Sequence, residues 1–260
     1  MTRRRAAAAG LALLTAVLTG CSSSAHESGG AKQKLTVLAA ASLTESFDTL
    51  AKRFEAEHPG VDVVTSYDSS ATIATQVVAG APADVVATAD TKTMDVMRKG
   101  KALAGPPVVF TRNRLALVVP ATDPAGIEQL ADLQHADYVT CVKSAPCGDL
   151  AAGLLAGTGI TNPPRSYEVD VKAVLMKVEL GEADAGFVYA SDVVAAGRSV
   201  EEVPLPQGTD AVTDYPIAVT ADSEHQDLAR SWVDLVRSRE GQKVLAKAGF
   251  TTHAGTSPPA

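Results

Sequence analysis

The chain has 260 residues, 46% of them hydrophobic, and its 30 acidic and 23 basic side chains give a formal net charge of −7. This acidic balance argues against nucleic acid or an anionic membrane surface as the partner. It is also unfavourable for an anion binder, in which neutral dipoles rather than a basic patch would have to hold the ligand.

The chain opens with the pattern of an export signal over residues 1–20. Three arginines precede a run of small and apolar residues at 6–18, which is too short to cross a bilayer comfortably. The Leu-Thr-Gly-Cys sequence that ends at Cys21 resembles the bacterial lipobox, in which the cysteine becomes the first mature residue and is acylated. Residues 21–33 are rich in serine and glycine and predict a flexible tether. We therefore expect a lipoprotein anchored to the outer face of the cytoplasmic membrane; an ordinary signal peptide with a stray cysteine is the alternative.

Strands and helices alternate after the tether. The hydrophobic pattern predicts, in order, a strand at 34–41, a helix from Leu43 that Pro59 and Gly60 end, a strand at 61–66, a helix at 71–79 and a buried strand at 83–89. This order favours parallel strands with right-handed crossovers, and hence an α/β layer fold.

A second set of elements follows the first. It comprises a strand at 115–120, a helix at 127–133, a strand at 138–142, a helix after Gly148, a helix at 171–180 and a strand at 185–190. A return strand at 215–220 and a final amphipathic helix carrying apolar residues from Leu228 to Leu245 complete the chain.

Loops that open helices hold the most informative residues. Ser42 stands where an N-cap belongs and Glu45 follows three residues later, which predicts a capping box. Similar loops are found at Asp68 to Ser70, at Pro146 to Gly148, and at Asp170. Helix capping or a plain turn explains each loop taken alone. Two such loops in each set, however, are what a cleft would use to surround an anion with helix N-termini.

The cysteines that remain after Cys21 are Cys141 and Cys147. In an exported chain this pair is more typical of a disulfide than of a redox or metal site. A zinc site is poorly supported, because no histidine pair lies at ligand spacing near the cysteines. We expect neither a cofactor nor a cation bound by protein ligands.

Several motifs together resemble the molybdate-binding proteins of ABC importers. They are Ala-Ala-Ala-Ser-Leu-Thr at 39–44, Ser-Ser-Ala-Thr-Ile-Ala at 69–74, Gly-Ala-Pro-Ala-Asp at 80–84, the segment from Gly181 to Tyr189, and Tyr215-Pro216. The resemblance extends over about residues 34–250 and depends on the combination, since no single motif is specific.

The resemblance implies a type II periplasmic-binding-protein fold, in which two α/β lobes enclose a ligand cleft. Lobe I would comprise residues 34–114 and 213–260, and lobe II residues 115–212. The implied function is capture of molybdate, and of tungstate, by a monomer that delivers the oxyanion to an ABC permease without catalysis.

The ligand contacts implied by the resemblance come from both lobes. Hydroxyl groups of Ser42 and Ser70 would bind the oxyanion from lobe I, with Ala41 and Ser69 flanking them. From lobe II the contacts would be main-chain N–H groups and a tyrosine, at Cys147, Val171 and Tyr189. Cys147 stands where better-known members carry a small residue without a thiol, and pairing with Cys141 would tie its loop down.

Three alternatives remain open at this stage. The ligand could be another tetrahedral oxyanion, namely sulfate, thiosulfate or phosphate; for phosphate, Asp68 or Asp170 could accept the ligand's proton. An exported serine hydrolase would need a G-x-S-x-G elbow with a histidine within reach, and the sequence has no such pattern. A ligand-sensing module of a receptor is the third.

Overall fold

The structure is a computed structural model that describes residues 32–206 and 211–252. The predicted signal peptide, Cys21 and nearly all of the predicted tether lie outside these residues. The tether is predicted to end at residue 33, but Gln33 is already the first residue of a strand. Within the described part of the chain, no helix is long and apolar enough to cross a membrane.

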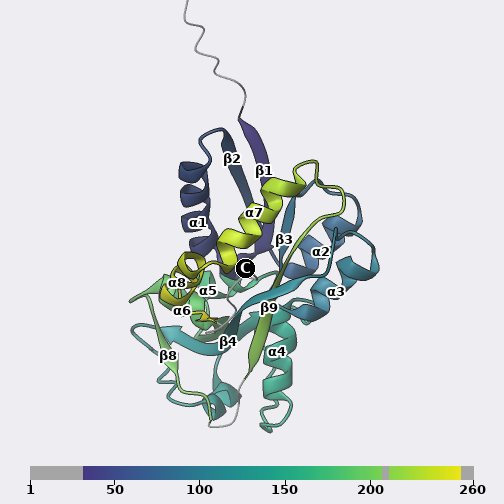
Figure 1. Cartoon of the computed structure of the whole chain (residues 1–260). Helices are drawn as coiled ribbons and strands as arrows, with labels where there is room; N and C mark the ends of the chain where they lie inside the picture. Colours follow the sequence, from purple (N-terminus) through teal and green to yellow (C-terminus); the bar gives the residue numbers. More distant parts are fainter. Residues whose placement is uncertain (1–31, 207–210, 253–260) are drawn as a thin grey trace, which may run out of the picture. The chain divides into compact units, whose positions relative to one another are not determined.

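The first set of elements forms a parallel sheet with strand order β2-β1-β3, as predicted. Its strands are β1 (Gln33–Ala40), β2 (Val61–Asp68) and β3 (Val85–Ala87), and its helices are α1 (Thr44–Glu57), α2 (Ser70–Val78) and α3 (Thr91–Lys99). In Figure 1, α1 lies on one side of these strands and α2 and α3 on the other. Helix α3 was not predicted, because Met94 and Met97 are its only large buried side chains and give a weak periodic signal.

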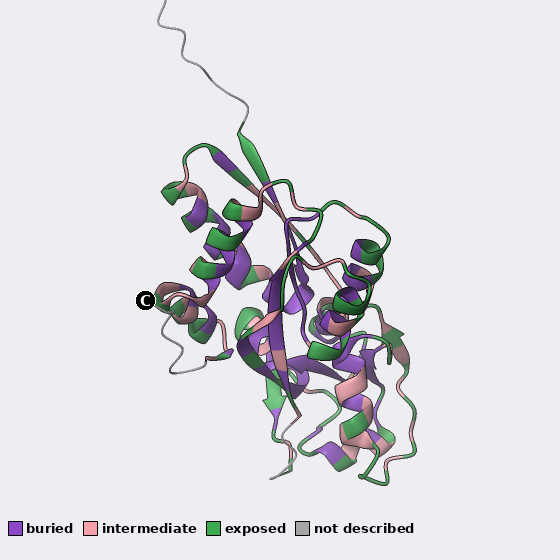
Figure 2. Cartoon of the chain, turned by 45° about the vertical axis from the view of Figure 1, so that its right-hand side comes forward, coloured by how far each residue is buried: buried purple, intermediate pink, exposed green. Residues whose placement is uncertain are grey.

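The second half of β1 and the whole of β3 are apolar because both faces are covered there. Leu35 and Val37 of β1 belong to the larger core cluster, which includes residues of α1, whereas Leu38 belongs to a smaller cluster with residues of α2 and α3. Figure 2 shows the buried residues concentrated in the strands and on the helix faces that cover them. Continuous apolar runs are typical of parallel strands buried on both faces.

Strand β4 (Val108–Pro120) connects this sheet to the second set of elements. Up to Arg114 it pairs antiparallel with β9 (Val212–Val219), and from Leu115 onward it pairs with β7 (Ala185–Tyr189) and β8 (Val200–Val203). The strand begins seven residues before the predicted start at 115, because its first half is the partner of the return strand β9.

The second set contains parallel strands in the order β7-β5-β6, where β5 is Tyr138–Cys141 and β6 is Ser166–Glu168. Its helices are α4 (Pro146–Leu155), α5 (Val171–Glu179) and α6 (Ala190–Ala196). Helix α4 was predicted to begin after Gly148 but begins at Pro146, which suits the first helical position because its missing N–H would have no helical partner there.

The helix predicted at 127–133 is instead a 3-10 helix, η2 (Leu130–His135). Its start is displaced because the Asp132 carboxylate accepts the N–H groups of Glu128 and Gln129 and so caps the chain at that point. The predicted final helix is two helices, α7 (Gln226–Arg237) and α8 (Arg239–Lys247), followed by β10 (Thr251–Thr252). The break occurs at Ser238, whose hydroxyl accepts the Gly241 N–H and caps α8.

Candidate functional site

Residues that the sequence singled out for ligand binding meet in one cavity. The start of α1 with its preceding 3-10 turn η1 (Ala41–Leu43), the starts of α2, α4 and α5, and the end of β7 all border it. Its lining comprises every predicted ligand residue, both flanking residues and five others: Ala40, Ala41, Ser42, Asp68, Ser69, Ser70, Ala89, Pro146, Cys147, Asp170, Val171 and Tyr189. The topology thus brings together loops separated by up to about 150 residues.

Ser42 does not cap a helix, so the predicted capping box with Glu45 is wrong. The 3-10 turn η1 delays the start of α1 to Thr44, and the N-cap position falls on Leu43, which makes no side-chain cap. The hydroxyl of Ser42 is buried and lies 2.8 Å from the hydroxyl of Tyr215. The Glu45 carboxylate instead accepts a hydrogen bond from Lys172 Nζ at 2.7 Å.

The neighbouring serines of α2 have different surroundings. The Ser70 oxygen accepts the N–H of Ala89 at 2.9 Å, which leaves the hydroxyl proton of Ser70 free to donate. The Ser69 hydroxyl is buried and has no hydrogen-bond partner among the described residues, while the Ser69 N–H donates to the Asp68 carboxylate at 2.6 Å. A buried polar group without a partner is uncommon and requires an explanation, for which an absent ligand is one candidate.

The loop at the start of α4 is held by two close contacts. Cys147 is joined to Cys141 by a disulfide that links this helix to the end of β5. Gly148 approaches the backbone so closely that a Cβ placed on it would lie 2.1 Å from the Val142 carbonyl oxygen. Because Pro146 has no N–H, the Cys147 N–H is the first one that α4 can present to the cavity.

The last two predicted contacts come from α5 and β7. Val171 is the first residue of α5, and the preceding Asp170 accepts the Ala173 N–H at 2.9 Å, which confirms its predicted capping role. The Tyr189 hydroxyl is fully buried and makes no hydrogen bond of ordinary geometry among the described residues, although it interacts with the Tyr215 hydroxyl, whose ring packs edge-on against its own. Burial raises the pKa of Tyr189 well above its ordinary value, so the phenol keeps its proton and can donate it.

The cavity is small and contains no basic side chain in its lining. The cavity volume is about 20 Å³, and a single bound water needs roughly 10–15 Å³. A space of this size suits an ion of a few atoms and not a sugar or a peptide. The only charged residues in the lining are Asp68 and Asp170, so hydroxyl and N–H dipoles must supply any attraction for an anion.

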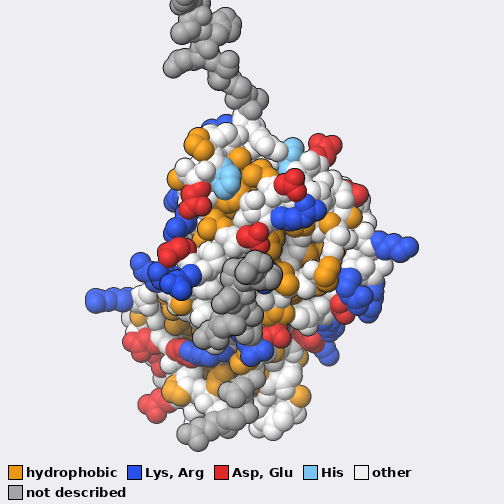
Figure 3. Space-filling model, viewed as in Figure 1, with side chains coloured by type: hydrophobic (Ala, Val, Ile, Leu, Met, Phe, Trp, Pro, Cys, Tyr) orange, Lys and Arg blue, Asp and Glu red, His pale blue; other side chains and the backbone are white. Residues whose placement is uncertain are grey.

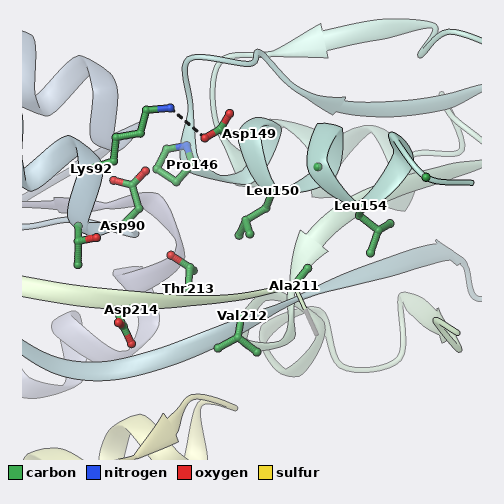
Figure 4. Close-up of a pocket in the computed structure, with 13 residues that line it drawn as sticks. Asp90, Lys92, Pro146, Asp149, Leu150, Leu154, Ala211, Val212, Thr213 and Asp214 are labelled. Carbon is green, nitrogen blue, oxygen red and sulfur yellow. Dashed lines mark hydrogen bonds and ion pairs between the residues drawn. The ribbon is translucent and has the colours of Figure 1, made fainter. Parts of the chain in front are cut away.

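A larger groove adjoins this cavity at Pro146 (Figure 4). It offers about 660 Å³ on the same measure, between the start of α3, helix α4 and the start of β9. Its acids have partners already: Asp149 pairs with Lys92 at 3.0 Å, and Asp214 with Arg112 at 2.6 Å. The groove therefore presents fewer unpaired groups than the smaller cavity, and we place the candidate site in the latter.

On the face in Figure 3, acidic and basic side chains are interspersed. Within residues 32–206 and 211–252, no group of three or more histidine, cysteine, aspartate or glutamate side chains is arranged to hold a metal ion.

Some lining residues were not predicted as contacts. Ala40 ends β1, and Ala89 lies two residues after the end of β3; neither side chain carries a functional group, so nothing in the sequence marks them. Tyr215 contacts Ser42 without lining the cavity, and its sequence motif indicated only a strand. Asp68 and Asp170 were considered as caps and as proton acceptors, and both border the cavity.

The sequence of this chain matches a known protein family and its members. Residues 35–251 match the family of bacterial extracellular solute-binding proteins. The chain is 38% identical over 246 residues to the molybdate-binding protein ModA of Mycobacterium tuberculosis. The aligned region covers 92% of this chain and 94% of that protein.

Two solved structures share the fold. The periplasmic molybdate-binding protein of Azotobacter vinelandii has a TM-score of 0.74 at 20% identity and covers 84% of this chain and 98% of its own. The sulfate-binding protein SubI of Mycobacterium tuberculosis has a TM-score of 0.75 at 21% identity and covers 85% of this chain and 88% of its own. The predicted periplasmic-binding-protein fold is confirmed, but two neighbours named for different oxyanions show that the fold alone does not select the ligand.

Proposed function

Because the chain belongs to the bacterial extracellular solute-binding proteins, and among them to the molybdate-binding proteins of ABC importers, we propose that it captures molybdate outside the cytoplasmic membrane. Tungstate, which has nearly the same size and charge, is the expected second ligand. The protein acts as a monomer that delivers the oxyanion to an importer permease and performs no catalysis.

The observation that carries this proposal is the set of unpaired donors around one small cavity. Among the described residues, the buried Ser69 hydroxyl has no partner and the buried Tyr189 hydroxyl interacts only with Tyr215. The starts of α2, α4 and α5 add N–H groups that have no partner within their own helices. The partial positive charge of the helix N-termini favours an anion, and charge-assisted hydrogen bonds are roughly twice as strong as neutral ones. Fixed dipoles of this kind can replace the water around a dianion even in an acidic protein.

Calorimetric titration with molybdate, tungstate, sulfate and phosphate tests the ligand. We expect molybdate and tungstate to bind with similar affinity, and sulfate and phosphate to bind much more weakly. Tighter binding of sulfate or phosphate than of molybdate would overturn the choice of substrate.

The specific alternative is sulfate, another tetrahedral oxyanion, whose binding protein SubI has the same fold. Phosphate is less favoured by the cavity, since Asp68 already accepts the Ser69 N–H and Asp170 the Ala173 N–H. Each carboxylate nevertheless has a second oxygen that can accept a hydrogen bond from the O–H group of a protonated phosphate. Phosphate affinity that increases as the pH falls from about 8 to 6 would support that alternative.

We further propose that the mature protein begins at Cys21 and is anchored by acylation of this residue. Fractionation of cells tests this: the unaltered protein should sediment with membranes, and a Cys21→Ser variant should not. Delivery to a permease is tested by adding the purified, molybdate-loaded protein to the reconstituted importer, whose ATP hydrolysis should rise.

A further inference from the structure

A buried polar network lies behind Ser42, outside the lining of the cavity. Tyr215 of β9 and Asn113 of β4 are both almost completely buried, at 0% and 1% exposure. The Asn113 amide nitrogen donates to the Ser191 hydroxyl at 2.8 Å and, more weakly, to the Tyr215 hydroxyl at 3.5 Å. The Tyr215 hydroxyl in turn lies 2.8 Å from that of Ser42.

The neighbours of Tyr215 favour one direction for the protons. The Asn113 carbonyl oxygen accepts the N–H of Arg114 at 3.0 Å, which identifies the other amide atom as the nitrogen facing Tyr215. An amide nitrogen can only donate, so the Tyr215 oxygen accepts there and its proton is available for Ser42. Burial raises the pKa of Tyr215 well above its ordinary value, which keeps that proton on the phenol.

The consequence for Ser42 follows directly. A serine oxygen that accepts a proton from Tyr215 must turn its own proton elsewhere, and the cavity is the remaining direction. With the opposite polarity, Ser42 would donate to Tyr215 and present lone pairs to the ligand. An oxyanion without protons can only accept hydrogen bonds, so only the first arrangement binds it.

We propose that Tyr215 is a positioning residue that holds the Ser42 hydroxyl as a hydrogen-bond donor to the bound oxyanion. Asn113 supports Tyr215 in this role. The inference rests on the proposed function. It extends that function by assigning a residue that does not itself touch the ligand and by explaining why the site accepts an anion free of protons.

The surroundings of Ser70 follow the same rule independently. The Ala89 N–H can only donate, and it points at the Ser70 oxygen at 2.9 Å. Each serine oxygen thus accepts from one protein donor, a phenol in the arrangement proposed for Ser42 and a main-chain amide for Ser70. Both hydroxyl protons remain for the ligand.

A double-mutant cycle tests the role of Tyr215. Tyr215→Phe keeps the ring and removes the hydroxyl, and we expect molybdate affinity to fall about tenfold, as for the loss of one oriented hydrogen bond. In a Ser42→Ala background the same substitution should change affinity less than twofold, since Tyr215 then has no hydroxyl to orient. A merely structural role would produce the same loss in both backgrounds and would overturn the inference.

Controls separate this inference from the proposed function. Tyr138→Phe removes another buried phenol, whose hydroxyl bonds to Asn162 at 2.9 Å away from the cavity, and it should leave affinity unchanged. If Tyr215→Phe fails to fold, Asn113→Ala serves as the second variant, with a smaller loss that also disappears without the Ser42 hydroxyl. Failure of the unaltered protein to bind any oxyanion would refute the proposed function and this inference with it. Normal binding that is insensitive to Tyr215→Phe would refute the inference alone.

Discussion

The Ser70 hydroxyl accepts the Ala89 N–H and lines the cavity, so its proton is available to a ligand there. We predict that Ser70→Ala weakens molybdate binding by about 1–3 kcal/mol, the usual cost of leaving a buried polar partner unpaired. The matched control is Ser46→Ala, which removes a hydroxyl that is equally buried but donates to the carbonyl of Leu43, the residue before its own helix. Calorimetry should show a loss for the first variant only; unchanged affinity in Ser70→Ala removes this residue from the site.

A buried carboxylate beside the site makes stability depend on pH. Burial raises the pKa of Asp192 from 3.8 to about 6, although Lys172, at 3.2 Å, opposes the shift. The folded state therefore holds this proton more tightly than the unfolded state does. Between about pH 4 and 6 the free energy of unfolding falls as the pH rises, by about 3 kcal/mol from this group. The destabilisation is absent below that window and complete above it.

Asp192→Asn should remove this pH dependence. Urea unfolding of both proteins at several pH values is the measurement, and the variant should gain stability relative to the unaltered protein as the pH rises from about 4 to 6. Parallel curves across this range would contradict the assignment to Asp192.

The residues predicted to bind the ligand all line one cavity, but the hydrogen bonds between them were not predicted. Ser42 and Ser70 attracted attention because hydroxyl residues precede helices, yet neither makes a side-chain cap in the structure. Tyr215 could not be found in this way. It is 173 residues from Ser42 in the sequence, and the two hydroxyls lie together only because β9 pairs with β3 and β4 in the sheet.

Among the elements, the disulfide between β5 and α4 has the clearest consequence. In a Cys21→Ser background, thiol counting without reductant should find no free cysteine. Replacing Cys141 and Cys147 with serine should lower the free energy of unfolding by about 2 kcal/mol, because a bond across a sequence separation of 6 closes only a short loop. Reductant should weaken the unaltered protein and leave the serine variant unaffected; equal sensitivity would argue against the bond.

The predicted elements differ from the observed ones where tertiary partners decide. Strong periodic patterns gave β1, α1, β5 and α5 nearly to the residue. The short strands β6 and β8 were not predicted. Their extended conformation depends on pairing with neighbouring strands and not on a hydrophobic pattern of their own. Helix α6 was hidden because it follows β7 without an intervening loop.

The chain passes between the two sets of strands twice, at the middle of β4 and just before β9, and these two passages lie side by side. The Leu115 N–H donates to the Ala211 carbonyl at 2.8 Å, at the point where β4 changes its partner. We infer that the two predicted lobes, which the structure describes over residues 34–114 with 213–252 and over residues 115–206 with 211–212, move relative to each other about this point. Small-angle X-ray scattering should then show a smaller radius of gyration with molybdate than without it. An unchanged radius would indicate that the lobes do not close on the ligand.

A cavity lined by carboxylates and neutral donors, in a chain with a formal charge of −7, also has a kinetic consequence. The protein and a dianion repel each other at long range, so added salt should screen the repulsion and raise the association rate. Most proteins with charged ligands show the opposite slope, because attraction guides their encounter. Stopped-flow measurements at several ionic strengths would establish the sign, and a rate that falls with salt would mean that a local positive field outweighs the net charge. The net charge of the protein therefore slows ligand association at low ionic strength, and association is expected to be fastest at high ionic strength.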